Sequence, residues 1–168
     1  ETDFVGKNEG FVKLATDLAN QALNFDTKEA FLASDFNGIT VADKLIEQTG
    51  VIGEKIEIAS FQRLSGAFVG SYIHAGNKIA TLVALSASVD GAEEASRNVA
   101  MQAAAMNPIA LDEAGVDASI IEKEVEIAKD QLRAEGKPEA MLDNIAKGKI
   151  QRFYKDNTLE NQDYIKDG

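Results

Sequence analysis

The sequence has 168 residues, enough for one domain or two small ones, and its 45% hydrophobic and 27% charged content is typical of a soluble globular protein. Seventeen Lys and Arg against 28 Asp and Glu give a net charge of -11, which disfavours nucleic acid and anionic membranes as direct partners. There is no cysteine, which excludes disulfides and thiolate metal sites, and no apolar run approaches the roughly 18 to 20 residues that cross a bilayer. Without a signal peptide, the expected location is the cytoplasm.

The first part of the chain is predicted to be helical. Asn8 can cap a helix over 8–23, in which apolar residues recur at three- and four-residue steps. Asp26 and Glu29 have the spacing of a capping box, which predicts a short helix over 27–33.

A turn or loop is expected next, over 35–38, where Asn and Gly occur together. Thr40 then caps a predicted helix over 41–48, and Gly50 is a plausible stop.

The pattern then changes from helical to alternating. Residues 55–58 alternate polar and apolar side chains, which predicts a half-buried strand. Strands are also expected over 66–73 and 78–86, joined by a hairpin loop that carries His74. The middle of the chain is therefore predicted to be an antiparallel ladder.

An Ala-rich helix is predicted over 92–106, opened by the capping-box spacing of Asp90 and Glu93 and ended by Asn107 before Pro108. Its small side chains favour close packing against a sheet or another helix.

From Ala118 onwards the sequence predicts two antiparallel helices joined at Gly136-Lys137-Pro138, where a glycine C-cap precedes a proline in a first turn. Apolar residues form a heptad-like seam between them. The seam consists of Ile121, Val125, Ala128 and Leu132 on the first helix and Leu142, Ala146, Ile150 and Phe153 on the second.

Motifs for dinucleotide, P-loop, zinc-protease and serine-hydrolase sites are absent from the sequence. His74 is the single histidine, and no second metal ligand lies at a usable spacing from it. Clustered glutamates on the predicted helices read as solvated faces with nearby lysines. The residues themselves indicate an acidic α+β protein with a helical hairpin, no catalytic site and no cofactor.

Seven short segments carry a resemblance to a known family. They are Thr2-Asp3-Phe4-Val5, Ile52-Gly53-Glu54, Gly70-Ser71-Tyr72-Ile73-His74, Ala103-Ala104-Ala105-Met106-Asn107-Pro108, Ile121-Glu122-Lys123-Glu124, Glu135-Gly136-Lys137-Pro138 and Asn161-Gln162-Asp163-Tyr164-Ile165. In this order and at these spacings, the chain resembles bacterial elongation factor Ts over essentially its whole length. That family consists of guanine-nucleotide exchange factors for elongation factor Tu and uses no catalytic residues of its own.

The resemblance implies a fold class and a division of the chain. The fold is α+β, with two small subdomains that carry antiparallel sheets and with a coiled-coil-like helical hairpin. Core subdomain N is expected over 1–74 and core subdomain C over 75–117, both incomplete, and the hairpin or dimerisation region with its following segment over 118–168.

The resemblance also assigns roles to residues. Thr2, Asp3, Phe4 and Val5 match the segment that disturbs the partner's Mg²⁺ site, with Phe4 as an aromatic wedge. Ile52, Gly53 and His74 match further contacts with the partner, elongation factor Tu in its GDP-bound and nucleotide-free forms. Read without the family, Phe4 is ordinary core, Asp3 a helix-entry cap and Gly53 a C-cap.

The sequence also departs from the family pattern. Family members carry a ubiquitin-associated-like domain and a first core strand before the Thr2–Val5 segment, and a helix and strand after the present end. A fragment with weak exchange activity is therefore expected, with sheet edges open to pairing with another copy. Two alternatives stay open: an assembly protein that forms homodimers through the hairpin, and a small hydrolase that uses His74.

Overall fold

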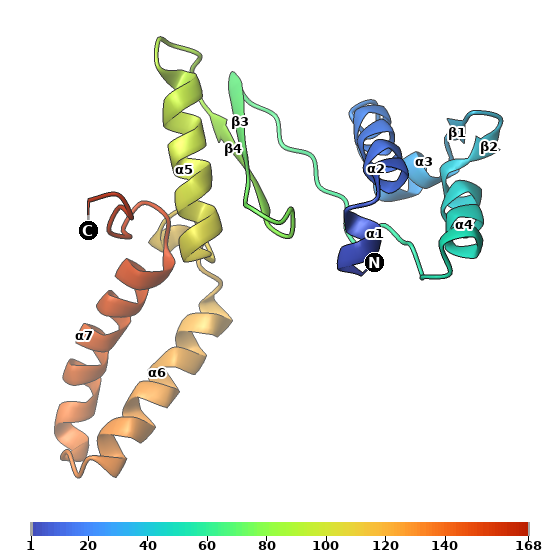
Figure 1. Cartoon of the computed structure of the whole chain (residues 1–168). Helices are drawn as coiled ribbons and strands as arrows, with labels where there is room; N and C mark the ends of the chain where they lie inside the picture. The colour runs from blue at the N-terminus through green and yellow to red at the C-terminus, as the bar shows by residue number, and fades with distance from the viewer. Residues whose placement is uncertain (1, 168) are drawn as a thin grey trace. The chain divides into compact units, whose positions relative to one another are not determined.

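The structure is a computed structural model that describes residues 2–167, and it divides into two compact units, Glu1–Arg63 (unit 1) and Leu64–Gly168 (unit 2). Each unit contains helices and one two-stranded antiparallel sheet, so the predicted α+β class is confirmed (Figure 1). The expected boundary between 74 and 75 lies in the turn that joins the paired strands of unit 2. The division into family subdomains stays a prediction. No helix within residues 2–167 combines the length and the apolar character needed to span a bilayer.

Unit 1 packs short helices around a small aliphatic and aromatic core. Its elements are α1 (Asp3–Gly6), α2 (Glu9–Ala22), α3 (Lys28–Ala33), β1 (Asp35–Phe36), β2 (Ile39–Thr40) and α4 (Val41–Ile52). The buried core residues are Leu18, Phe31, Phe36, Val41 and Leu45. This core fixes α4, whose last turn leads into the candidate site.

Three local predictions in unit 1 are confirmed. The Asn8 side chain accepts a hydrogen bond from the Phe11 N–H at the start of α2, as an N-cap does. Thr40 caps α4 in the same way. The turn expected over 35–38 is found at Asn37 and Gly38, which have positive φ angles and join β1 to β2, while Asp35 and Phe36 form β1.

Three others are wrong in detail. The cap of α3 is Thr27, because the Asp26 carboxylate pairs with Arg63 instead. Helix α4 continues through Gly50, which a helix tolerates, and ends only at Gly53 with a φ of 78°.

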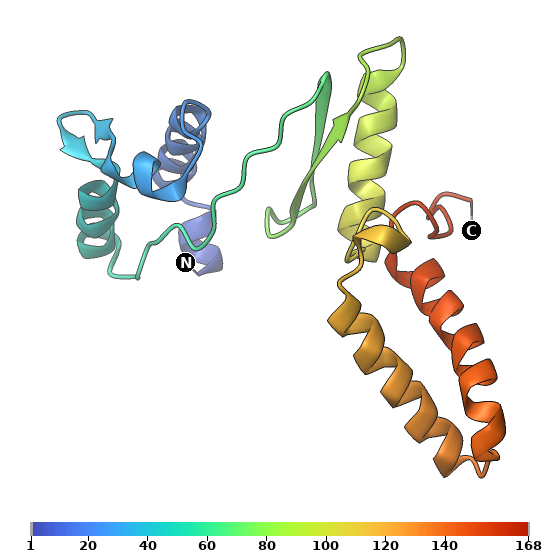
Figure 2. The same ribbon diagram turned by 180° about the vertical axis from the view of Figure 1, so that it is seen from behind.

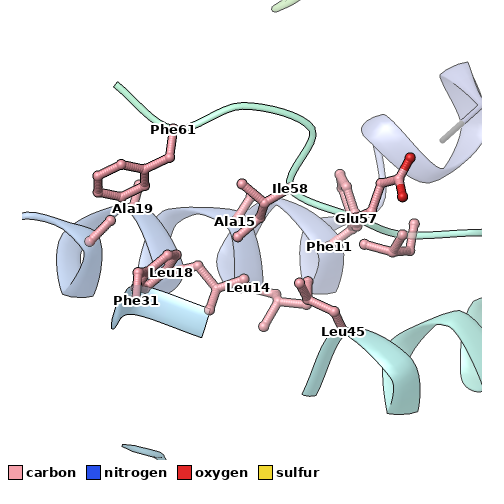
Figure 3. Close-up of a pocket in the computed structure, with 12 residues that line it drawn as sticks. Phe11, Leu14, Ala15, Leu18, Ala19, Phe31, Leu45, Glu57, Ile58 and Phe61 are labelled. Atoms are coloured by element: carbon pink, nitrogen blue, oxygen red, sulfur yellow. The ribbon is translucent and has the colours of Figure 1, made fainter. Parts of the chain in front are cut away.

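The third concerns residues 55–58, which were expected to form a strand. Their side chains alternate between exposed and half-buried as predicted, but no ladder partner pairs with them within residues 2–167. Ile58 and Phe61 instead face α2 across an apolar cavity of about 280 Å³ (Figure 3). The alternation of polar and apolar residues over 55–58 therefore reflects a segment that buries one side against helices, and not a strand in a sheet.

Unit 2 begins with a hairpin covered by one long helix. Strand β3 (Phe68–Ile73) pairs antiparallel with β4 (Ala80–Leu85), and α5 (Ala92–Met106) packs on the sheet (Figures 1 and 2). The predicted helix and both predicted strands are confirmed, although the cap of α5 is Gly91 rather than Asp90. Small residues on α5 permit close approach, and the Thr81 hydroxyl donates to the Ala100 carbonyl at 2.6 Å.

The predicted helical hairpin is confirmed. After the 3₁₀ turn η1 (Glu113–Gly115), α6 (Ala118–Ala134) and α7 (Glu139–Asn157) run side by side (Figures 1 and 2). Ala128, Leu132, Leu142 and Ala146 are the buried members of the predicted seam. The hairpin thus buries the half of its seam next to the turn within one chain, and the other seam residues are half-buried.

Candidate functional site

The Thr2–Val5 segment forms a single exposed helical turn. Thr2 is the N-cap of α1, and Asp3 lies in its first turn. Phe4 has 90% of its surface exposed, whereas Val5 is half-buried. A large aromatic ring exposed to this extent is unusual, because burying such a ring is worth about 1.5 to 3 kcal/mol. The interpretation of Phe4 as ordinary core is therefore wrong.

Two hydrogen bonds join this segment to the end of α4. The Thr2 amide donates to Glu54 Oε2 at 2.6 Å, and the Thr2 hydroxyl donates to Glu54 Oε1 at 2.7 Å. The Thr2 hydroxyl also holds the pKa of the Glu54 carboxyl below its ordinary value, because it stabilises the ionised form. The carboxylate thereby contacts Thr2 through both of its oxygens.

Ile52 and Gly53 lead directly into this contact. Ile52 is the last residue of α4, and Gly53 adopts the left-handed conformation that ends the helix. No atom lies within 4 Å of a Cβ built on Gly53, so its backbone angle, rather than crowding, favours glycine here. The structure therefore brings together the two predicted segments of unit 1, Thr2–Val5 and Ile52–Gly53.

His74 belongs to unit 2, where it begins the turn after β3. The Tyr72 hydroxyl lies 3.0 Å from His74 Nδ1, and the two ring centroids are 6.0 Å apart. His74 is exposed and Tyr72 is half-buried, and the hydrogen bond orients the imidazole through Nδ1, leaving Nε2 on the far side of the ring. A side chain held in this way fits a contact role.

Sequence reasoning missed Glu54 and Tyr72 as candidate functional residues. Each lies inside a segment that carries the family resemblance: Glu54 directly follows Gly53, and Tyr72 lies two residues before His74. The available signal for Glu54 was local: a glycine that ends a helix reverses the chain, so the next side chain can reach a neighbouring element. For metals, no group of three or more His, Asp or Glu side chains within residues 2–167 is arranged to hold an ion.

Comparison with known proteins decides the family. The family model described as Elongation factor TS matches residues 1–168. The chain belongs to the elongation factor Ts family. It is 78% identical over 167 residues to the elongation factor Ts of Flavobacterium psychrophilum and 68% identical over 167 residues to that of Christiangramia forsetii, covering in each case 99% of this chain and 61% of the relative.

A more distant family member, the elongation factor Ts of Amoebophilus asiaticus, is 46% identical over 170 residues, with 99% of this chain and 61% of the relative covered. The chain thus spans about three fifths of the length of these elongation factor Ts proteins.

Proposed function

We propose that this chain acts on elongation factor Tu as a guanine-nucleotide exchange factor, binding the GDP-loaded form and promoting GDP release. It carries out no covalent step, and it needs no cofactor of its own. The function would place it in the cytoplasm, with the other components of translation. The observation that carries the proposal is the exposed Phe4 ring on α1, joined through Thr2 and Glu54 to the Ile52–Gly53 end of α4.

The proposed mechanism is mechanical and electrostatic. Phe4 enters the partner near its Mg²⁺ and phosphate site, with Thr2, Asp3 and Val5 beside it, and displaces packed elements there. A shift of the ion removes the positive charge that neutralises the diphosphate, so GDP binds less tightly. Ile52 and Gly53 contact the same partner close to α1, and His74 contacts it from unit 2.

Linkage sets the energy that these contacts must supply. The chain must bind nucleotide-free partner more tightly than GDP-bound partner, by the same factor by which it weakens GDP binding. Each tenfold of that factor requires about 1.4 kcal/mol of differential contact energy. A few well-packed aromatic residues can supply several kcal/mol at an interface, which is why a single exposed ring is the natural candidate.

The first test removes the ring. Phe4→Ala should lower the acceleration of GDP release by about 30-fold, because truncating an interfacial hot spot costs about 2 kcal/mol or more. The measurement is stopped-flow release of a fluorescent GDP analogue from elongation factor Tu across a range of concentrations of this protein.

Leu23→Ala is the matched control, since Leu23 is also a large apolar residue of unit 1 and is 71% exposed. It should leave the exchange rate unchanged. Equal rates for the parent and Phe4→Ala would exclude the wedge. A parent protein that fails to accelerate GDP release at any concentration would contradict the function itself.

The alternative, self-association through the hairpin, is less well supported by the packing. The seam residues nearest the turn, Leu132 and Leu142, are each 2% exposed, because α6 and α7 cover one another. A seam buried within one chain offers less apolar surface to a second copy. Sedimentation at micromolar concentration separates the two ideas, since a stable dimer indifferent to elongation factor Tu would favour the assembly role.

A further inference from the structure

The hydroxyl of Thr2 does not cap its own helix. A threonine at an N-cap ordinarily accepts a hydrogen bond from a backbone N–H two or three residues along. In α1 the Thr2 side chain makes no such bond and donates to Glu54 Oε1 instead. The backbone amide of the same residue donates to Glu54 Oε2. Both oxygens of one carboxylate therefore hold the N-cap residue of α1, in hydrogen bonds strengthened by the negative charge.

Helix α1 needs an external restraint of this kind. It has four residues and no buried side chain, and an isolated turn of helix is unstable in water. Its own backbone adds a bond from the Gly6 N–H to the Thr2 carbonyl at 2.9 Å, and at its end the Lys7 and Asn8 N–H groups donate to the Val5 carbonyl. Because Phe4 is exposed, its burial cannot fix the position of the turn.

Glu54, by contrast, is tied to the core of unit 1. Helix α4 contributes Val41 and Leu45 to that core, and Gly53 turns the chain at the end of the same helix. Glu54 follows one residue later, at the place where its carboxylate reaches Thr2. A continuous path thus runs from the buried core through α4 and Glu54 to the exposed turn.

We propose that Glu54 is a positioning residue, which holds α1 by its N-cap residue and so presents Phe4 in one orientation. This inference rests on the proposed exchange function, in which the orientation of Phe4 matters because the ring enters the partner. A wedge ordered before binding loses less conformational freedom on entering the partner, so more of its contact energy remains to weaken nucleotide binding. Gly53 acts through Glu54 in this scheme, in addition to any contact that it makes itself.

The first experiment measures order at position 4 without any partner. The sequence contains no tryptophan and three tyrosines, so Phe4→Trp introduces a single tryptophan, which can be excited selectively and whose anisotropy reports local mobility. Glu54→Ala and Thr2→Val, each made in this background, should lower the anisotropy. Glu54→Gln keeps one acceptor oxygen and should give an intermediate value. The double variant should be no more mobile than Glu54→Ala alone, because both changes break the same contact.

Glu57→Ala is the control, since Glu57 is a nearby carboxylate that pairs at 2.7 Å with Lys55 rather than with α1. It should leave the anisotropy unchanged. Unchanged anisotropy in Glu54→Ala, or additive losses in the double variant, would overturn the positioning role. Far-UV circular dichroism of each variant checks that the fold is intact.

The second experiment measures GDP release from elongation factor Tu with Phe4 in place. Glu54→Ala should lower the stimulated rate by about three- to tenfold, the effect of one or two exposed hydrogen bonds, and Glu57→Ala should not. If Glu54→Ala lowers the anisotropy at position 4 but leaves the release rate unchanged, the role of Glu54 in exchange is overturned while the wedge stays intact. If the parent does not stimulate release, the exchange function fails, and the anisotropy alone still decides whether Glu54 orders the turn.

Discussion

Gly70 is the residue in unit 2 at which an added methyl group would have the least room. A Cβ built on Gly70 would clash with both Oγ and Cβ of Ser96, and Ser96 is fully buried. The close packing of β3 against α5 therefore depends on the absence of a side chain at this position. The sequence marked Gly70 only as part of a family-like segment, because the neighbour that crowds it is 26 residues away along the chain.

Gly70→Ala should lower the free energy of unfolding by about 2 to 3 kcal/mol, because overpacking forces backbone or side-chain shifts. Urea unfolding followed by circular dichroism measures the change. Gly148→Ala is the control: Gly148 lies in α7 with no atom within 4 Å of a built Cβ, so alanine there should stabilise by about 0.5 to 1 kcal/mol.

Adding Ser96→Gly to Gly70→Ala tests the contact itself. The second change removes both clashing atoms, so the double variant should lose less stability than the sum of the two single variants. Additive losses would show that the crowding at Gly70 comes from elsewhere.

At the scale of elements, the sequence predicted the parts of the fold that depend on local pattern. The helix over 92–106, the β3–β4 hairpin and the hairpin of α6 and α7 were all predicted from periodicity and turn residues, and all are confirmed. The sequence signals for these elements are local, since the apolar positions of a helix and the glycines of a turn lie within a few residues of the structure they specify.

The errors arise where a partner distant in sequence decides the outcome. Residues 55–58 alternate as a strand does, yet pairing requires a neighbouring strand, and the pattern alone cannot supply one. Thr27 rather than Asp26 caps α3 because Arg63, 37 residues away, binds the Asp26 carboxylate. The candidate site follows the same rule. Its segments could be identified from the sequence, but nothing near Glu54 in the sequence indicates that its carboxylate binds Thr2, 52 residues away.

An ion pair between α6 and α7 gives the helical hairpin a pH dependence. Lys129 Nζ lies 2.9 Å from Asp143 Oδ1. The hydrogen bond and charge of Lys129 lower the pKa of Asp143, and the same carboxylate raises the pKa of Lys129. Stability from the lowered Asp143 pKa is present above the unfolded value of about 3.9 and is lost as pH falls through the folded pKa. The contribution of Lys129 is lost only at high pH, as pH rises through its raised pKa.

Asp143→Asn should therefore lower the melting temperature at pH 6 and flatten its decline between pH 5 and pH 2.5. Thermal unfolding of parent and variant across that range provides the measurement. Asp156→Asn is the control, because Asp156 is an exposed carboxylate of α7 that pairs with Arg152 on the same helix at 3.4 Å. A pH profile for Asp143→Asn that parallels that of the parent would remove the interhelical pair as a source of the dependence.

At the scale of the whole chain, the segments that lead into and out of the hairpin of α6 and α7 are hydrogen-bonded to each other. The Ile109 N–H donates to the Asn157 carbonyl at 2.9 Å, and the Leu159 N–H donates to the Ala110 carbonyl at 3.0 Å. Ala110 and Thr158 form a parallel bridge between them. The polypeptide that leaves α5 and the one that returns from α7 are thus paired, which is consistent with one unit extending from Leu64 to the end of the chain.

Gln102 makes further connections between α5 and the segment that follows α7. It is 5% exposed, and its amide nitrogen donates to the Asp163 carbonyl at 3.1 Å while its oxygen accepts from the Ile165 N–H at 2.9 Å. One buried side chain of α5 therefore satisfies two backbone groups about 60 residues away. Such a group is costly to remove, because its partners lose hydrogen bonds that water cannot fully replace.

Gln102→Leu keeps the approximate volume of the side chain and removes both backbone bonds, together with a longer one from the Gln102 amide nitrogen to Gln162 Oε1 at 3.4 Å. It should lower the free energy of unfolding by about 1 to 3 kcal/mol and speed hydrogen exchange at Ile165 and its neighbours, because the returning segment loses its anchor on α5. Gln151→Leu, at an exposed position of α7, is the matched control and should leave both quantities unchanged. If exchange at Ile165 keeps the rate of the parent, other contacts hold the segment, such as the bond from Lys166 Nζ to Asn98 Oδ1 at 2.8 Å, and the amide of Gln102 contributes no restraint.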